Sequence, residues 1–205
     1  SETAVAEDHR ALLRVGAVGL NFRDVLNVMG QYPGNPGEPG ADCAGTIQAT
    51  SSAVLRAVLG DVVCGMAEGC LRAYVCTHAG LLQTMPSVWS LEEACTMPTT
   101  WSTVFLALGN LAQLRRGNRV LVHAATGGVG LVAVEFAKHV GAVVFGTAGA
   151  QRKQEHLREL GVECISTSRN SEVFAVDMEA VLGVQRLDAV LSSLSHDEYI
   201  PRSAC

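Results

Sequence analysis

The first half of the chain alternates short apolar runs with clusters of glycine and proline. Runs of this kind, separated by turn residues, are typical of β-strands in a barrel-like domain. The predicted strands are residues 12–18, 43–49, 62–66 and 73–77. Between the first two lies GQYPGNPGEPG at residues 30–40, whose prolines and glycines predict a loop. The first half is therefore expected to form a β-rich domain.

The second half has a different pattern, in which buried-type apolar runs alternate with helical stretches. Ser90 followed by Glu93 is a capping-box sequence and predicts a helix start. Predicted strands are residues 119–124, 142–146, 164–165 and 188–194, and predicted helices are residues 100–111, 131–139, 152–160 and 173–182, the third of these capped by Gly161. Alternating strands and helices predict βαβ units around a parallel sheet. We expect a first domain of residues 1–96 and a second of residues 97–205.

The glycine-rich segment AATGGVG, residues 124–130, follows a predicted strand and opens a predicted helix. A dinucleotide-binding turn requires this position. Gly127 would let the backbone approach a pyrophosphate, and Gly130 would let the helix pack closely on the strand. The helix N-terminus would offer free N–H groups and a positive dipole end to the anion. The alternative is an ordinary glycine-rich turn, but the βαβ context favours nucleotide binding.

The residues after the second predicted strand of this half distinguish between two nucleotides. NAD-binding folds usually place an acidic residue there, where it bonds the ribose 2′-hydroxyl. Here residues 146–149 read GTAG without an acid, and Arg152 and Lys153 follow. These cations would attract a 2′-phosphate that a carboxylate would repel. The sequence therefore favours NADPH, with a solvent-exposed helix start as the alternative explanation of the two cations.

Composition and charge narrow the classes of partner. The formal net charge is −5, which argues weakly against nucleic acid, because binding a phosphate backbone usually needs a basic face. We expect no membrane partner, since no apolar run is long enough to span a bilayer, and the polar N-terminus is unlike a signal peptide. The seven cysteines include no C-x-x-C pair, so we expect no structural zinc site. Small buried thiols of a reducing compartment, the cytosol, explain them better.

Four segments of the chain resemble the medium-chain dehydrogenase/reductase superfamily. They are NFRDVL at residues 21–26, GQYPG at 30–34, GADCAG at 40–45 and the AATGGVG turn. The first two most resemble enoyl reductase domains of polyketide and fatty-acid synthases, whereas the turn is shared with quinone oxidoreductases. The resemblance implies a GroES-like barrel domain and a Rossmann domain, with the active site in a cleft between them. Ala41 stands where zinc-dependent relatives have a metal-binding histidine, so no metal is expected, and the role of the neighbouring Asp42 stays open.

The resemblance also implies roles for individual residues. Tyr32 matches a tyrosine linked to protonation stereochemistry in some polyketide enoyl reductases and is the candidate catalytic residue. The alternative is an aromatic ring packed on the Pro33-Gly34 turn. The candidate cofactor-binding residues are Asn21, Thr103 and Ser193 at the nicotinamide end, Gly127, Gly128 and Val129 at the pyrophosphate, and Thr147, Lys153, Ser168 and Arg169 around the 2′-phosphate. Asn21 could equally be a turn residue, and Asp24 the N-terminal charge of a helix.

Two histidine positions could suggest acid–base chemistry. His123 lies within a predicted buried strand beside the glycine turn, where a packed core histidine is the commoner case. His196 and Asp197 follow the fourth predicted strand of the second half, but neighbours in sequence rarely bring their side chains together. We expect neither position to be catalytic.

The reaction implied by the resemblance is NADPH-dependent reduction of the α,β-double bond of an enoyl thioester. The implied partners are an acyl chain on an acyl carrier protein and the other domains of a multidomain synthase, and a dimer is left open. Two alternatives remain, a free-standing NADPH:quinone reductase and a non-catalytic nucleotide-binding remnant. Family members are longer, and their later strands and a downstream lysine and aspartate have no counterpart before Cys205. We therefore expect a C-terminally truncated α/β fold that is poorly stable alone or needs a partner segment.

Overall fold

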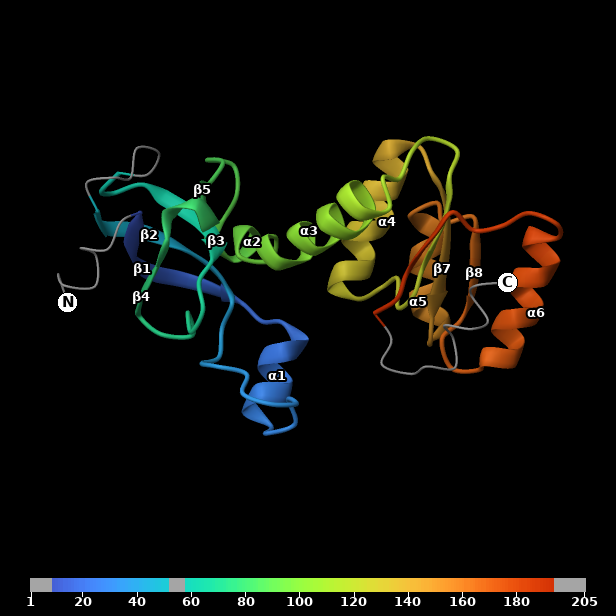
Figure 1. Ribbon diagram of the computed structural model, residues 1–205, viewed down its shortest axis with the longest axis horizontal. Coiled ribbons are helices and arrows are strands. Elements are labelled where there is room, and N and C mark those ends of the chain that lie inside the picture. Colours follow the sequence, from blue (N-terminus) through green and yellow to red (C-terminus); the bar gives the residue numbers. More distant parts are fainter. Residues whose placement is uncertain (1–8, 52–57, 194–205) are drawn as a thin grey trace. The chain divides into compact units, whose positions relative to one another are not determined.

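The computed structural model divides the chain into two units, Ser1–Thr99 and Thr100–Cys205 (Figure 1). The structure describes residues 9–51 and 58–193. Each unit has its own sheet and its own clusters of buried apolar side chains. Helix α3 (Pro98–Val104) contains the point of division.

The first unit contains a five-stranded antiparallel sheet with the order β4-β1-β2-β3-β5. Its strands are β1 (Arg10–Gly19), β2 (Asp42–Thr50), β3 (Val62–Met66), β4 (Tyr74–His78) and β5 (Leu82–Thr84). The four predicted runs are all strands, so the β-rich prediction for this half is confirmed. Strand β5 follows a short 3₁₀ turn, η2 (Ala79–Leu81), and was not predicted. Its three residues are too few to carry a recognisable alternation.

Inward-facing residues of these strands form the core of the first unit. Leu13, Ile47, Val63 and Val75 are buried in one apolar cluster, which also contains Cys43 and Cys70. All six described cysteines are free thiols, and four of them are buried. For these four, the expectation of small buried hydrophobes is confirmed.

Two short helices accompany this sheet. Helix α1 (Phe22–Val28) begins directly after β1 with Asn21 as its N-cap. The sequence indicated this helix only as an alternative, with Asp24 as its N-terminal charge, because the apolar residues Phe22 and Val28 are largely exposed and mark no buried face. Helix α2 (Leu91–Ala94) begins at the predicted capping box. Ser90 Oγ accepts the N–H of Glu93 at 3.2 Å, and Glu93 Oε2 accepts the N–H of Ser90 at 2.9 Å.

The second unit is built on a four-stranded parallel sheet with the order β8-β7-β6-β9. The strands are β6 (Arg119–Val122), β7 (Val143–Ala148), β8 (Cys164–Thr167) and β9 (Ala189–Leu191), and each corresponds to a predicted strand. Within this unit the sheet therefore runs third, second, first, fourth, which is the strand order of a Rossmann fold. The order reverses between β6 and β9, and folds of this type bind their ligands beside such a point.

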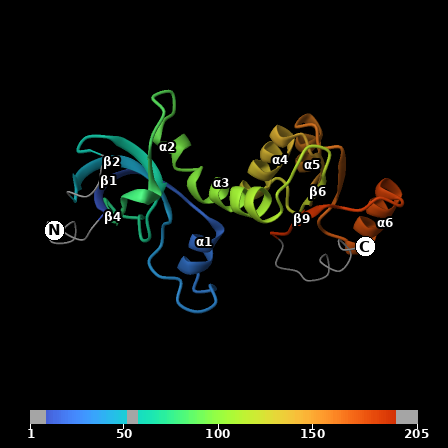
Figure 2. The ribbon, with the colours of Figure 1, turned by 45° about the horizontal axis from the view of Figure 1, so that its top comes forward.

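Helices cover both faces of the parallel sheet (Figure 2). Helices α4 (Gly128–Val140) and α5 (Gln151–Glu159) pack on one face, and α6 (Ser171–Leu182) packs on the other. Strand β6 shows the division, since Val120 and Val122 belong to the first cluster while Leu121 lies with Phe174 in the second. Alternating side chains of one strand thus serve two cores. The α/β prediction for this half is confirmed.

The helix predicted at residues 100–111 is present in two forms. Its first part belongs to α3, and its second part, η3 (Phe105–Leu111), is π-helical. An apolar helical pattern does not distinguish an α-helix from this wider form. Across the described ranges, no helix is both long enough and apolar enough to cross a membrane.

Candidate functional site

The glycine-rich turn joins β6 to α4 and has two kinds of glycine. Gly127 and Gly128 are exposed, and a Cβ added at either would meet no atom closer than 3.3 Å. Gly130 is buried, and a Cβ there would lie 2.4 Å from the carbonyl oxygen of Ala124 and 2.7 Å from Ala125 backbone atoms. Gly130 is therefore required for the close approach of helix and strand, while Gly127 and Gly128 leave the outer surface of the turn uncovered.

The N-terminus of α4 gives this turn the character of an anion site. The helix has 13 residues and Gly127 as its N-cap, in an extended conformation. Its first N–H groups, those of Gly128, Val129 and Gly130, have no partner within the helix and lie at the positive end of the helix dipole. A diphosphate fits such a bare glycine surface, because N–H groups bind phosphate oxygens where no side chain intervenes.

The turn is supported from below by Thr147 at the end of β7. Its side chain is fully buried, and its Oγ1 accepts the N–H of Ala124 at 3.1 Å. The carbonyl of Thr147 accepts the N–H of Ala125 at 2.9 Å. Ala124 has a positive φ of 48°, so these bonds hold the chain where it leaves the favoured conformations. Thr147 thus positions the turn, and a contact between Thr147 and a 2′-phosphate stays a prediction.

His123 is a packed residue at the end of β6. Its side chain is 1% exposed, its Nδ1 lies 3.3 Å from Thr147 Oγ1, and its ring is 5.4 Å from that of Phe174. Burial lowers the pKa of His123 to about 4, so the ring is uncharged at neutral pH. The hydroxyl of Ser193 donates to the carbonyl oxygen of His123 at 3.2 Å, which places Ser193 beside the β6 end. This environment agrees with the expectation of a core histidine. The other predicted pair, His196 and Asp197, lies outside the described residues.

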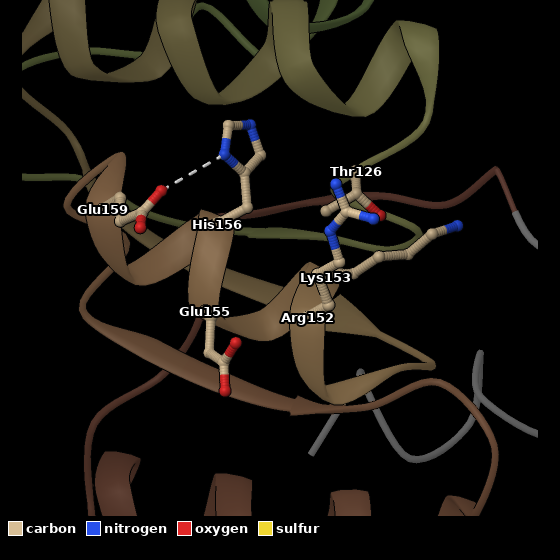
Figure 3. Close-up of a pocket in the computed structure, with 6 residues that line it drawn as sticks. All are labelled: Thr126, Arg152, Lys153, Glu155, His156 and Glu159. Atoms are coloured by element: carbon tan, nitrogen blue, oxygen red, sulfur yellow. Dashed lines mark ion pairs between the residues drawn. The ribbon is translucent and has the colours of Figure 1, made fainter.

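A hollow of about 550 Å³ lies beside the turn. It is lined by Thr126 of the turn and by five residues of α5, namely Arg152, Lys153, Glu155, His156 and Glu159. Figure 3 shows the side chains of Arg152 and Lys153 on the side of Thr126, whereas the carboxylate of Glu155 points away from them. His156 Nδ1 lies 3.6 Å from Glu159 Oε2, farther along the helix. The end of the hollow next to the turn therefore carries the positive charge.

Ser168 and Arg169 follow β8, the strand next to β7. Gly149 lies beside them, since a Cβ on Gly149 would meet Arg169 Nε at 2.7 Å and Ser168 Oγ at 3.1 Å. Because Gly149 has no side chain, the guanidinium of Arg169 can lie close to the backbone at this position. Cations therefore follow both β7 and β8, at the ends where Rossmann sheets bind their ligand.

In the first unit, the predicted residue Asn21 belongs to a buried hydrogen-bond network. Asn21 Nδ2 donates to Asp42 Oδ2 at 3.0 Å. The other oxygen of Asp42 accepts from the N–H of Thr99 at 3.0 Å and from its hydroxyl at 2.6 Å. Asp24 is also buried and accepts the N–H groups of Asn21 at 2.9 Å and of Gly40 at 2.8 Å. Asp24 is thus an N-terminal charge of helix α1 that also ties the loop to it, and Asn21 is the N-cap.

Burial raises the pKa of Asp42, and the charge of Asp24 adds to this effect. The hydrogen bonds from Asn21 and Thr99 oppose it, because they stabilise the carboxylate. Asp42 is therefore a buried acid whose ionised form depends on these donors.

Tyr32 lies in the predicted loop and is half-buried. The guanidinium of Arg23 lies 5.7 Å from the centre of its ring, within the range of a cation–π contact. Its backbone N–H donates to the carbonyl of Leu26 at 3.2 Å. The ring is therefore held by a contact with α1.

Thr103 lies in α3 with an exposed side chain. It is one helical turn from Thr100, whose methyl group would lie 3.5 Å from a Cβ on Gly128. The start of α3 is therefore close to the glycine turn.

Some residues around these positions were not singled out from the sequence. They are Thr99 in the Asp42 network and Thr126, Glu155, His156 and Glu159 around the hollow. The last three could have been found from the sequence, because together with Arg152 they have the spacing of residues on one face of a helix. No local pattern marks Thr99, which is distant from Asp42 in sequence.

Two family models match the chain. The alcohol dehydrogenase GroES-like domain matches residues 7–105, and the zinc-binding dehydrogenase family matches residues 128–204. The chain is 37% identical over 187 residues to the pikromycin polyketide synthase component PikAII of Streptomyces venezuelae. That match covers 90% of this chain but 5% of PikAII.

Solved structures with the same fold include two kinds of reductase. The CurK enoyl reductase superposes with a TM-score of 0.87 at 37% identity, covering 96% of this chain and 62% of that one. A quinone oxidoreductase from Coxiella burnetii gives a TM-score of 0.77 at 28% identity, covering 93% and 61%. The mycobacterial protein Rv1454c, solved in complex with NADPH, gives 0.84 at 25% identity, covering 96% and 61%. The chain thus spans less than two thirds of the length of each of these proteins.

The side chains of the described residues do not fit the metal that one of these families is named for. No group of three or more histidine, cysteine, aspartate or glutamate side chains within the described ranges is placed to hold a metal ion. Both oxygens of Asp42 already accept hydrogen bonds from Asn21 and Thr99, and Ala41 offers no ligand.

Proposed function

Because this chain belongs to the medium-chain dehydrogenase/reductase superfamily and is related to the enoyl reductases of polyketide synthases, we propose that it reduces the α,β-double bond of an enoyl thioester with NADPH. The relatives at the sequence level are parts of large multidomain synthases. The proposed substrate is therefore an acyl chain on an acyl carrier protein, presented by the other domains of such a synthase in the cytoplasm.

The observation that carries the cofactor proposal is the pair of cations at the end of the hollow next to the glycine turn. Arg152 and Lys153 line the hollow together with Thr126 of the turn itself. A nucleotide whose diphosphate lies on the N-terminus of α4 would extend its adenosine ribose past the end of β7. There the chain has cations and, at residues 146–149, no carboxylate. This charge pattern supports NADPH over NADH, with Lys153, Ser168 and Arg169 as proposed partners of the 2′-phosphate.

The residues of this chain are proposed to bind and orient the cofactor and to donate a proton to the substrate. NADPH supplies the hydride that is added to the β-carbon of the substrate. Asn21, Thr103 and Ser193 are proposed to orient the nicotinamide end, and Gly127, Gly128 and Val129 to bind the diphosphate. N–H donors must stabilise the negative charge that develops on the thioester oxygen. Tyr32 is proposed to donate the proton to the α-carbon, with its ring held by Arg23.

The test is the oxidation of NADPH, followed by absorbance, after addition of a crotonyl thioester or a quinone. The proposal predicts turnover with the thioester, and a Tyr32→Phe variant with changed stereochemistry or rate of α-protonation but unchanged NADPH affinity. Turnover with the quinone alone would replace the proposal by the second candidate, a quinone reductase, which the Coxiella burnetii structure favours. NADPH binding without any turnover would make the chain a nucleotide-binding module.

A further inference from the structure

The chain leaves the parallel sheet at neighbouring points after β7 and after β8. Ala148 and Thr167 are the last residues of these two strands, and they are paired in register. The N–H of Ser168 donates to the carbonyl of Ala148 at 3.4 Å, which continues the pairing for one more step. Gly149 and Ser168 are therefore neighbours at the carboxyl edge of the sheet, the edge at which Rossmann sheets bind their ligands.

Arg169 follows a fixed turn, and its side chain lies against Gly149. The N–H of Arg169 donates to Thr167 Oγ1 at 3.0 Å, a local bond that holds the turn after the strand. A Cβ added to Gly149 would meet Arg169 Nε at 2.7 Å and Arg169 Cδ at 3.4 Å. Gly149 immediately precedes Ala150, the N-cap of α5. The guanidinium therefore lies beside the start of α5 because residue 149 has no side chain.

Three cations thus gather around the start of α5 without an opposite charge. Arg152 and Lys153 belong to the first turn of this helix, which contains no acidic residue. Among the described residues, no carboxylate forms an ion pair with these two side chains or with Arg169. Cations near a helix N-terminus are unfavourable on their own, because the positive end of the helix dipole lies there. A bound phosphate would turn this unfavourable arrangement into a favourable one.

We propose that Gly149 determines the preference for a 2′-phosphorylated nucleotide, because its missing side chain lets the guanidinium of Arg169 join the two cations of α5 in binding the phosphate. This inference rests on the proposed function for the identity of the nucleotide. Arg169 supplies planar N–H donors whose geometry suits phosphate oxygens. Gly149 itself contacts no part of the phosphate through a side chain, so it is a positioning residue that acts through Arg169.

The test compares two ligands that differ only in the 2′-phosphate, 2′-phospho-ADP-ribose and ADP-ribose. Calorimetric titration uses the full chain, Gly149→Ala, Arg169→Ala and the double variant. Binding of 2′-phospho-ADP-ribose is expected to weaken about fivefold in Gly149→Ala and about tenfold in Arg169→Ala, as for the loss of a charge-assisted hydrogen bond. The double variant should be no weaker than Arg169→Ala, because Gly149 acts through Arg169. Binding of ADP-ribose should not change in any of them.

Gly109→Ala is the matched control, because it adds the same methyl group elsewhere in the second unit, 3.3 Å from the ring of Phe105 and 3.5 Å from that of Phe136. It should leave both affinities unchanged. Gly149→Ala should keep the melting temperature, because the side chain of Arg169 is exposed and can move aside. The inference is overturned if Gly149→Ala leaves the affinity for 2′-phospho-ADP-ribose unchanged or weakens both ligands equally. It is also overturned if the losses of the two single variants multiply in the double variant.

A second measurement needs no change at Gly149. The Nε–H signal of Arg169 can be assigned in NMR spectra of the unmodified chain by its absence in Arg169→Ala. It is expected to shift on addition of 2′-phospho-ADP-ribose but not of ADP-ribose, and an equal response to the two ligands would overturn the inference. If the folded chain binds neither ligand, the proposed cofactor and this inference fail together. Selective binding without turnover of an enoyl thioester would overturn only the proposed reaction.

Discussion

In the first unit, the residues around Asn21 are held by two buried carboxylates, whereas in the second unit the turn at residues 124–130 is held by backbone packing and one buried hydroxyl. Asp24 and Asp42 accept hydrogen bonds from distant parts of the chain. In the second unit the support comes from Gly130, which lets α4 touch β6, and from Thr147. The comparison shows that the segment around Asn21 is held by charged side chains, whereas the turn is held by the close packing that a glycine allows and by one uncharged hydroxyl.

The largest effect is expected at the backbone contact of the second unit. Gly130→Ala places a methyl group against main-chain atoms at 2.4 to 2.7 Å that cannot move aside. We expect the free energy of unfolding to fall by about 3 kcal/mol. Denaturant unfolding followed by Trp101, in a Trp89→Phe background, reports on the second unit.

Gly128→Ala is the matched control for that substitution. Its Cβ would meet only the Thr100 methyl group at 3.5 Å, an ordinary contact. We expect no loss of stability from it. Equal effects of the two substitutions would show that close packing is not what holds the turn.

The second largest effect is expected on NADPH binding, from the two cations that lie beside the turn. Arg152→Ala combined with Lys153→Ala removes the two cations at the turn end of the hollow. NADPH affinity is expected to fall about thirtyfold, with little change for NADH, because only the 2′-phosphate is lost as a partner. Arg158→Ala changes a cation of the same helix that does not line the hollow, and it should leave both affinities unchanged. A similar loss of NADPH affinity from Arg158→Ala would show that the overall positive charge of the helix matters, and not a specific contact of Arg152 and Lys153.

The third prediction uses the buried, uncharged histidine of the second unit. Burial lowers the pKa of His123 from 6.5 to about 4. As the pH falls below 6.5, the unfolded state takes up a proton that the folded state does not, so stability is lost until about pH 4. Between pH 7 and pH 5 this loss is about 2 kcal/mol.

His123→Gln is the variant that isolates this contribution. The difference between the unfolding free energies at pH 7 and pH 5 should shrink by that amount, while all other titrating groups contribute equally to both chains. An unchanged pH dependence would contradict the buried, neutral state of His123. Asp42 in the first unit contributes with the opposite sign, because its raised pKa means that stability is lost as the pH rises through it.

The smallest effect is expected from the hydroxyl under the turn. Thr147→Val keeps the shape of the side chain but leaves the N–H of Ala124 without its acceptor at 3.1 Å. We expect a loss of about 1 kcal/mol in unfolding free energy. Thr147→Ser keeps the hydroxyl and should lose less, and a reversed order would show that the methyl group matters more than the bond.

Much of the second unit could be predicted from the sequence because its signals are local. The glycine turn, the capping box at Ser90 and the alternating strands and helices each depend on neighbouring residues. Gly130 in particular was predicted for the reason that the structure shows, a close contact of helix and strand. The Rossmann domain that the family resemblance implies is also confirmed, since the four strands of the parallel sheet have the order of such a fold.

The network of the first unit could not be predicted, because its members are far apart in sequence. Asn21, Asp42 and Thr99 meet only after β2 pairs with β1 and the chain returns through α2. Nothing in the neighbourhood of Asp42 indicates that it would accept from both. Thr147 is a second example, since its position at the end of β7 suggested a contact with the 2′-phosphate, whereas its buried hydroxyl accepts a hydrogen bond from the turn.

The central claim is that the second unit binds NADPH through the glycine turn and the adjacent cations. Fluorescence titration of the unmodified chain with NADPH and NADH tests it most directly. The account predicts that NADPH binds at least about tenfold more tightly than NADH, in line with a charge-assisted contact to the 2′-phosphate. Equal affinities, or tighter binding of NADH, would contradict the role given to Arg152 and Lys153. Binding of neither nucleotide by the folded chain would contradict the role of the turn itself.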